Sequence, residues 1–229
     1  MARTPVLLAW SGGKDAAWTL HVLRQRDDIH VVGLLTTVTK DDQRVSMQGI
    51  RRSVLHAQTK ATGLPLIEAM IPAHCTNEDY VQAMTDALVQ AAQRWAGLRT
   101  MAFGDLFLED IRAWRVRNLA NIGWDVLTPL FGMDTGALAR EMIAGGLRAR
   151  LCCVDTQQLD TAFAGRPFDE ALLRDLPVDV DPCGENGEFH TCVSAGPVFD
   201  APLELVQGDT ELRDGRFAFT DYALADARP

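Results

Sequence analysis

The chain has no long hydrophobic run and little positive charge, and both absences exclude classes of protein. No segment approaches the roughly 18 apolar residues of a membrane span, and Val6–Trp10 is too short for a signal peptide's apolar region. Lys and Arg number 22 against 31 Asp and Glu, which gives a net charge of −9. Binding nucleic acid through its phosphates needs a concentrated basic surface. We therefore expect a cytoplasmic protein that does not work on a membrane or mainly on nucleic acid.

Cysteine is scarce and lacks the spacing of a metal site or a redox pair. No two cysteines form a Cys-x-x-Cys pair, and their odd count predicts free thiols instead of a disulfide framework. Without ligand spacing, no structural metal site is expected. Cys152 and Cys153 fall in an apolar Leu-Cys-Cys-Val run, which favours small buried strand residues over nucleophiles.

The remaining composition is typical of a folded α/β protein. Hydrophobic residues make up 47% of the 229 residues and charged residues 23%, with no low-complexity arm or internal repeat. Short apolar runs alternate with longer amphipathic stretches, which indicates βαβ units and an open parallel sheet of five strands flanked by helices. The expected strands are Val6–Trp10, Val31–Val38, Leu66–Ile71, Thr100–Phe103 and Asp125–Thr128. Apolar residues at helical spacing, such as Val81, Met84 and Leu88, predict helices that pack on this sheet.

A change of pattern after the fifth run predicts a second, smaller part. Pro129 ends the run and redirects the chain, so we divide it into an N-terminal sheet domain (residues 1–130) and a C-terminal α+β part (residues 131–229). In the second part, Thr135–Ala144 reads as a helix stopped by two glycines and Ala149–Val154 as a strand. Leu203–Val206 and Phe217–Thr220, separated by polar residues, predict a terminal β-hairpin.

The first turn of this pattern carries the strongest functional signal. Ser11, Gly12, Gly13, Lys14 and Asp15 stand between the first strand and the first helix, where free backbone N–H groups and the helix dipole favour an anion. The glycines allow close approach to phosphate oxygens, and the serine hydroxyl and lysine amine add a donor and a charge. Asp15 is either a helix-start residue or, beside bound phosphates, a ligand for Mg²⁺.

Two further polar segments are candidates for the rest of the site. Asp105 follows the fourth strand, at the edge where open parallel sheets bind ligands, whereas Glu109 and Asp110 suit an ordinary acidic first helical turn. The densest polar cluster, residues 181–191, has two glycines for an unusual backbone path and several oxygen-bearing side chains. Its candidate substrate-binding residues are Gly184, Glu185, Asn186, Glu188 and Thr191.

The loop and these two segments resemble known proteins. Ser-Gly-Gly-Lys-Asp resembles the PP-loop of the ATP pyrophosphatases, with Ala16 where that family usually has a second serine, so one phosphate contact is missing. Together with residues 104–112 and Gly-Glu-Asn-Gly-Glu-Phe-His-Thr, it resembles the diphthine ammonia ligase family. The resemblance reaches to about residue 200 and implies a HUP-like nucleotide-binding domain. In eukaryotes and archaea the substrate of that family is diphthine on a translation elongation factor.

This resemblance implies an ATP-dependent ligase that forms an acyl-adenylate on a carboxylate and then an amide with ammonia, releasing AMP and pyrophosphate. The implied cofactors are ATP and Mg²⁺, and the implied catalytic residues are Lys14, Asp15 and Asp105. Glu185 and Glu188 could attract the trimethylammonium group of diphthine, with Phe189 offering a ring face. The acceptor, the ammonia source and a homo-oligomeric state stay open, since the sequence does not name the organism.

Several alternatives remain at this stage. Other PP-loop proteins modify tRNA, although the acidic composition argues against that, and Ala16 leaves room for an ATP-binding module without catalysis. Gln48 lies either near the nucleotide base or at a helix start, and His190 is either an acid–base group or a loop histidine with local hydrogen bonds. Arg112, Arg115 and Arg117 form either a solvated helix face or a phosphate or partner contact.

Overall fold

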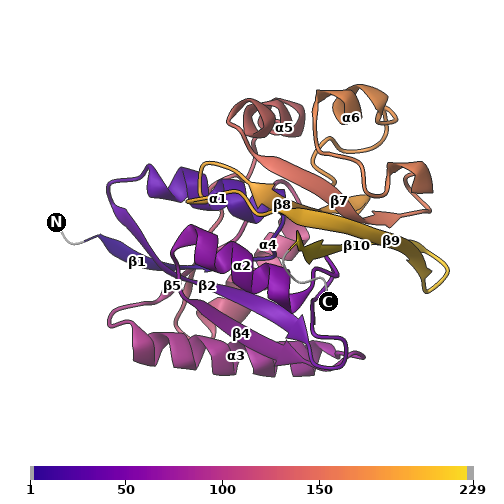
Figure 1. Cartoon of the computed structure of the whole chain (residues 1–229). Coiled ribbons are helices and arrows are strands. Elements are labelled where there is room, and N and C mark those ends of the chain that lie inside the picture. The colour runs from indigo at the N-terminus through magenta and orange to yellow at the C-terminus, as the bar shows by residue number, and fades with distance from the viewer. Residues whose placement is uncertain (1–2, 226–229) are drawn as a thin grey trace.

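The computed structural model describes residues 3–225 and contains two sheets with helices between and around them (Figure 1). Five strands of the larger sheet are parallel and run in the order β4-β2-β1-β5-β6, as the sequence predicts. The two-residue strand β3 (Arg44–Val45) adds an antiparallel pairing to β2. The parallel strands are β1 (Thr4–Ala9), β2 (Ile29–Thr39), β4 (Leu66–Ile71), β5 (Thr100–Ala102) and β6 (Asp125–Leu127).

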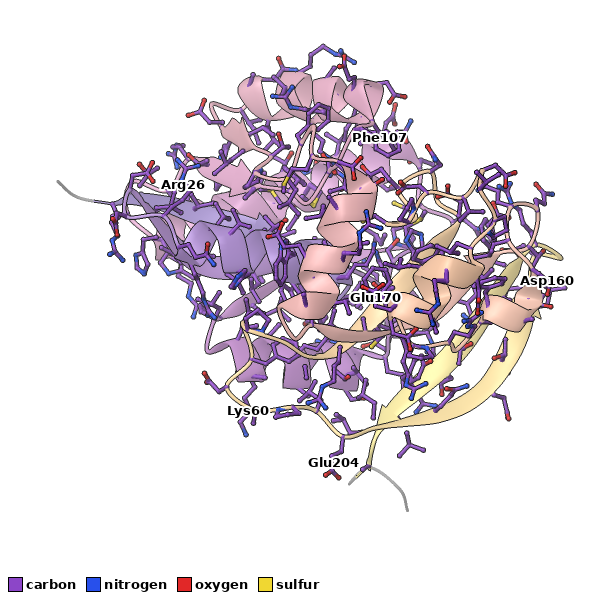
Figure 2. All side chains as sticks on the ribbon, turned by 90° about the horizontal axis from the view of Figure 1, so that it is seen from above. Arg26, Lys60, Phe107, Asp160, Glu170 and Glu204 are labelled. Carbon is purple, nitrogen blue, oxygen red and sulfur yellow. The ribbon has the colours of Figure 1, made fainter. Side chains whose placement is uncertain are left out.

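Helices cover both faces of this sheet, and each face of the sheet has its own apolar core. Figure 1 shows α1 (Lys14–Arg24) and α2 (Arg52–Thr62) on the face toward the second sheet, and α3 (Asn77–Arg94) on the opposite face. α4 (Glu109–Ala120) contributes Leu119 to the core that contains Leu88 of α3. Val81 was expected in this core but is 37% exposed, because α3 turns Ala87, Leu88 and Ala91 inward. Charged side chains such as Arg26 and Lys60 lie on the outside (Figure 2).

The C-terminal part is the smaller α+β unit that the sequence predicts, but three of its strands differ from expectation. The predicted helix and strand are confirmed as α5 and β7, whereas the hairpin strands are longer than predicted because polar residues continue the pairing. β8 was not predicted as a strand; residues 189–191 belong to the polar cluster 181–191, yet they pair with β7. The elements are α5 (Thr135–Ala144), β7 (Arg148–Asp155), a 3₁₀ turn (Thr161–Phe163), α6 (Glu170–Asp175), β8 (Phe189–Ala195), β9 (Leu205–Arg213) and β10 (Phe217–Leu224). The antiparallel order is β8-β7-β10-β9.

The two sheets share the core that surrounds α1 and α2. Leu20 of α1, Leu55 of α2 and Val193 of β8 belong to the same buried cluster. β8 packs against α1, and β10 packs against α2. This packing brings the start of β8 to the loop that follows β1, so residues from both halves of the chain meet at one edge of the parallel sheet.

Candidate functional site

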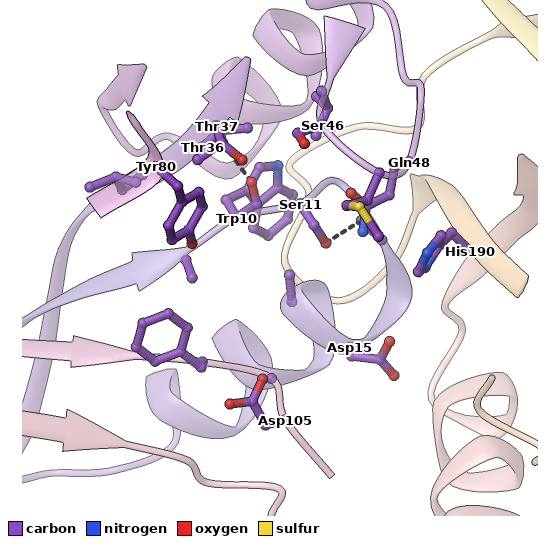
Figure 3. A pocket seen from close by; sticks show the side chains of 18 of the residues that line it. Trp10, Ser11, Asp15, Thr36, Thr37, Ser46, Gln48, Tyr80, Asp105 and His190 are labelled. Carbon is purple, nitrogen blue, oxygen red and sulfur yellow. Dashed lines mark hydrogen bonds between the residues drawn. The ribbon is translucent and has the colours of Figure 1, made fainter. Parts of the chain in front are cut away.

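A cavity of about 620 Å³ opens at the carboxyl ends of the parallel strands (Figure 3). The strand order reverses at β1, with β2 and β4 on one side and β5 and β6 on the other. Ligands of open α/β sheets bind at such a reversal. The residues that follow β1 and β5, among them Trp10 and Phe103, line the cavity together with residues 184, 185 and 189–191 from the C-terminal part.

The glycine-rich turn forms one wall of this cavity. Gly12 has φ +78°, a conformation that favours glycine, and Gly13 is the N-cap of α1 without a side-chain hydrogen bond. Ser11, Gly13, Lys14 and Asp15 line the cavity, whereas Gly12 does not. The N–H of Gly13 donates to the hydroxyl of Ser11 at 3.3 Å. The structure therefore places the glycine-rich turn at the start of α1, as the sequence predicts, and anion binding there stays a prediction.

Lys14 is buried, with only 2% of its surface exposed. Its amine donates to the Asp15 carboxylate at 2.8 and 3.0 Å and to the backbone carbonyl of Cys183. The amine also lies 5.6 Å from the ring centre of Phe168 and 5.5 Å from that of Phe189. Burial is the largest single influence and lowers the pKa of Lys14, but the charge and hydrogen bond of Asp15, together with Cys183 and Glu185, outweigh it and raise this pKa above its usual value. The lysine is thus a fixed positive charge beside the turn.

Asp105 lies at the end of β5 and faces the same cavity (Figure 3). Its carboxylate pairs with Arg115 of α4 at 3.0 Å, and the guanidinium stands 4.2 Å from the ring centre of Phe103. Burial raises the pKa of Asp105, although the charge of Arg115 opposes this shift. Of the three clustered arginines, Arg115 lines the cavity, whereas Arg112 stacks on Phe131 outside it. Glu109 and Asp110 form the first turn of α4, which confirms the plainer expectation for both.

Glu185 brings a carboxylate of the C-terminal part to the cavity. It accepts a hydrogen bond of 2.7 Å from the N–H of Leu106. Burial raises the pKa of Glu185 to about 7; this N–H opposes the shift, and repulsion from Asp15 and Asp105 adds to it. Gly184 and Thr191 also line the cavity, and the hydroxyl of Thr191 accepts the Lys14 backbone N–H at 3.0 Å. Three segments far apart in the sequence therefore supply acidic or hydroxyl groups to one space.

Besides Gly12, two predicted site residues, Asn186 and Glu188, do not line the cavity. Glu188 is 2% exposed and accepts from the backbone N–H of Asp181 at 2.9 Å and from the Asn186 amide at 3.0 Å. Both side chains therefore hold the 181–188 segment in shape. A direct role of either in substrate binding stays a prediction.

Several cavity residues were missed or left undecided by sequence reasoning. Gln48 lies four residues before α2 and lines the cavity, so its helix-start interpretation is wrong. His190 is on β8 and also lines the cavity; burial, together with the charge of Lys14, lowers its pKa to about 4 and keeps the ring neutral. Thr36, Thr37 and Tyr80 gave no sequence signal, because a hydroxyl at a strand end or in a helix is common (Figure 3).

A further link across the two sheets holds the segment that contains Gln48. Asp221 of β10 pairs with Arg44 at 2.9 Å and with Arg51 at 2.5 Å, and these arginines flank residues 45–50. Arg44 also donates to the Gly49 carbonyl at 2.7 Å. The C-terminal hairpin therefore fixes a wall of the cavity.

The donor set also bears on metal binding. Among residues 3–225, no three His, Cys, Asp or Glu side chains gather closely enough to hold an ion by themselves. Mg²⁺ commonly takes one or two carboxylates together with substrate phosphates and water. Asp15, which belongs to the glycine-rich turn, fits that kind of site.

Among residues 3–225, no helix has the length and hydropathy to cross a bilayer. All five cysteines are free thiols.

Comparison with known proteins covers both parts of the chain. The diphthamide synthase N-terminal domain model matches residues 3–123, and the diphthamide synthase C-terminal domain model matches residues 134–220. Diphthine–ammonia ligase of Schizosaccharomyces pombe is 24% identical over 212 residues, covering 85% of this chain and 35% of the relative. The Saccharomyces cerevisiae protein of the same name is 23% identical over 245 residues, covering 90% and 36%. The chain thus spans about a third of the length of these relatives. Because the N-terminal domain model alone matches more than half of the residues, the chain belongs to the diphthamide synthase family.

Proposed function

We propose that this protein is an ATP-dependent carboxylate–ammonia ligase that works through an acyl-adenylate. A carboxylate oxygen of the acceptor attacks the α-phosphorus of ATP, and pyrophosphate leaves. The nitrogen of ammonia then attacks the acyl carbon, AMP leaves, and a proton is lost from the nitrogen to give the amide. The observation that carries this proposal is the convergence of the Ser11–Asp15 turn, Asp105 and Glu185 on one cavity at the strand-order reversal.

The turn is the proposed site of the β- and γ-phosphates. Its support is the glycine conformation at Gly12, the place of the turn at the start of α1, where the N-cap Gly13 has no side-chain hydrogen bond, and a buried lysine charge. In this role Lys14 and the backbone of Gly13 stabilise the negative charge that develops on the leaving pyrophosphate. Ser11 contributes a hydroxyl donor. Catalysis then rests mainly on positioning and charge neutralisation.

Asp15 is the proposed ligand of Mg²⁺, which when bound supplies charge neutralisation at the phosphate oxygens. The position of Asp15 on the cavity wall, within the glycine-rich turn, supports this assignment. Asp105 is proposed to orient the reacting groups opposite the turn. Its pairing with Arg115 keeps the carboxylate in one place.

The C-terminal side of the cavity is the proposed acceptor site. Glu185, with Asp15 and Asp105, makes this region acidic, which suits an acceptor that carries a cation beside its carboxylate. Diphthine, named in the relatives, is proposed as one such acceptor; another small carboxylate is the alternative where diphthine is absent. Of the two glutamates with a proposed cation role, Glu185 lines the cavity and Glu188 supports it from behind.

The test is a screen for pyrophosphate release from ATP with ammonium, Mg²⁺ and a panel of carboxylates, diphthine-bearing protein included. We expect release only when ammonium and a suitable acceptor are both present, together with AMP in equal amount. A Lys14→Ala variant should lose at least about a hundredfold in rate, the scale of losing one preorganised charge contact. Lys60→Ala, the same change at an exposed lysine of α2 that does not line the cavity, is the matched control.

The products distinguish the alternatives. ADP and phosphate as products would remove the adenylation chemistry altogether. Tight ATP binding without turnover across the panel would instead favour a non-catalytic ATP-binding module. AMP formation that depends on tRNA and falls with added salt would favour a tRNA-modifying enzyme.

A further inference from the structure

Gln58 of α2 is fully buried behind the Ser11–Asp15 turn and has no role in the chemistry described above. Its amide nitrogen donates to the carbonyl of Gly12 at 3.0 Å and to the carbonyl of Val193 at 2.8 Å. A Cβ on Gly12 would stand only 2.5 Å from the Gln58 amide oxygen. The side chain therefore joins three elements that the cavity needs together: α2, the turn and β8.

The buried side-chain amide of Gln58 also has an energetic cost. Its oxygen is buried and has no hydrogen-bond partner among residues 3–225. An unpaired buried acceptor destabilises a fold, and an apolar side chain of similar length would avoid that cost. What the glutamine adds over such a side chain is the pair of hydrogen bonds to Gly12 and Val193.

These bonds fix the direction of the Gly13 N–H group. The carbonyl of Gly12 and the N–H of Gly13 belong to one planar trans peptide, so they point in opposite directions. Gln58 and the Val193 N–H, at 3.0 Å, hold the carbonyl on the side away from the cavity, which Gly12 does not line. The Gly13 N–H is thereby turned toward the hydroxyl of Ser11, on the cavity wall.

We propose that Gln58 is a positioning residue for the phosphate-binding turn, which acts by holding the Gly12 carbonyl so that the Gly13 N–H faces the cavity. The proposal rests on the proposed function, because it assumes that the turn binds phosphate. Gln58 does not touch the ligand. It supplies the rigidity that two successive glycines lack.

The experiment compares Gln58→Met with Thr59→Val, a control at a buried residue of the same helix that removes a partly buried hydrogen bond to the His56 carbonyl. Dissociation constants for ATP and pyrophosphate are measured by calorimetry below the melting temperature of each variant. We expect Gln58→Met to bind both about tenfold more weakly, the scale of one lost hydrogen bond, and Thr59→Val to bind as wild type does. Equal constants for wild type and Gln58→Met, or equal losses in both variants, overturn the proposal.

Two readouts keep the test independent of fold stability. In wild type, added pyrophosphate should shift the amide resonance of Gly13, and in Gln58→Met this shift should shrink; an unchanged shift overturns the proposal. If Gln58→Met does not fold, Gln58→Glu replaces it, since a carboxylic acid at about pH 6 can donate to Gly12 and a carboxylate at about pH 9 cannot. The affinity of Gln58→Glu for pyrophosphate, divided by that of wild type at the same pH, should decrease from about pH 6 to about pH 9. A ratio that stays constant over this range overturns the positioning role.

The same measurements separate this proposal from the function beneath it. If wild type binds ATP and Lys14→Ala does not, the phosphate site stands and only the Gln58 variants decide the positioning role. If wild type binds neither ATP nor pyrophosphate, the phosphate site fails and the role of Gln58 falls with it.

Discussion

The backbone N–H of Lys14 donates a hydrogen bond of 3.0 Å to the hydroxyl of Thr191, 177 residues farther along the chain. Lys14 is the first residue of α1, and first-turn N–H groups have no partner within a helix. The N-cap, Gly13, has no side chain to offer. Thr191 of β8 therefore caps α1, a helix that packs on the parallel sheet. The C-terminal part of the chain thus supplies a hydrogen-bond acceptor to the turn.

Thr191→Val should lower the free energy of unfolding by about 1 kcal/mol, because valine keeps the volume but removes the cap. The freed Lys14 N–H then becomes available to a phosphate, so ATP should raise the melting temperature of this variant more than that of wild type. Thr220→Val, which loses a hydrogen bond of 2.8 Å to Thr210 in the hairpin, is the control with a wild-type response to ATP. Unfolding curves with and without ATP measure both effects. An undiminished stability would contradict the capping role.

Ala16→Ser should strengthen pyrophosphate binding several-fold, roughly the contribution of one hydrogen bond. Ala16 is 5% exposed and lines the cavity, so a hydroxyl there can reach a bound phosphate. Ala17→Ser is the matched control, because Ala17 is 1% exposed and does not line the cavity. That variant should lose stability without gaining affinity. Titration calorimetry with pyrophosphate gives the comparison, and equal affinities for both variants would count against a phosphate at this position.

Asp221→Asn should weaken ATP binding several-fold without contact to the ligand. The substitution removes the charge that holds Arg44 and Arg51, so residues 45–50 lose a fixed position at the cavity wall. Asp209→Asn, an exposed change in the same hairpin, should bind ATP as wild type does. Raising the salt concentration should reduce the difference in ATP affinity between wild type and Asp221→Asn, because salt screens partly exposed ion pairs. A salt-independent gap would argue for a packing effect instead.

Glu185 should make wild-type stability depend on pH in a way that Glu185→Gln removes. Burial raises the folded-state pKa to about 7 from an ordinary value of 4.5, so between these values the folded protein binds more protons than the unfolded chain. The contribution of this group is complete below the ordinary value and is lost as the pH rises through about 7. The stability of the variant relative to wild type should therefore increase over that window. The test is to measure the free energy of unfolding with denaturant at several pH values in this window, with Glu211→Gln as the exposed control. The same pH dependence of this free energy in wild type and in Glu185→Gln would contradict the prediction.

The sequence alone predicted the parallel sheet and the place of the phosphate-type turn. Both follow from local patterns: apolar runs such as Leu66–Ile71 that fit a buried strand, and glycines at a strand-to-helix turn. β8 was missed altogether, because its first residues, 189–191, belong to a polar, glycine-containing segment and its pairing with β7 is a long-range contact. The hairpin was drawn too short for the same reason: its exposed polar residues are held by cross-strand pairing and not by hydrophobic pattern.

The sequence by itself determined which chemical groups the chain owns and which turn can receive an anion, because backbone conformation at Gly12 and the start of α1 depend on near neighbours. Only the tertiary structure decided which groups meet. Packing of β8 on α1 brought Thr191 to Lys14 and Glu185 to Asp105, turned Glu188 inward, and buried Gln58 against Gly12. Those choices depend on how two sheets share one core, and no short stretch of residues carries that information.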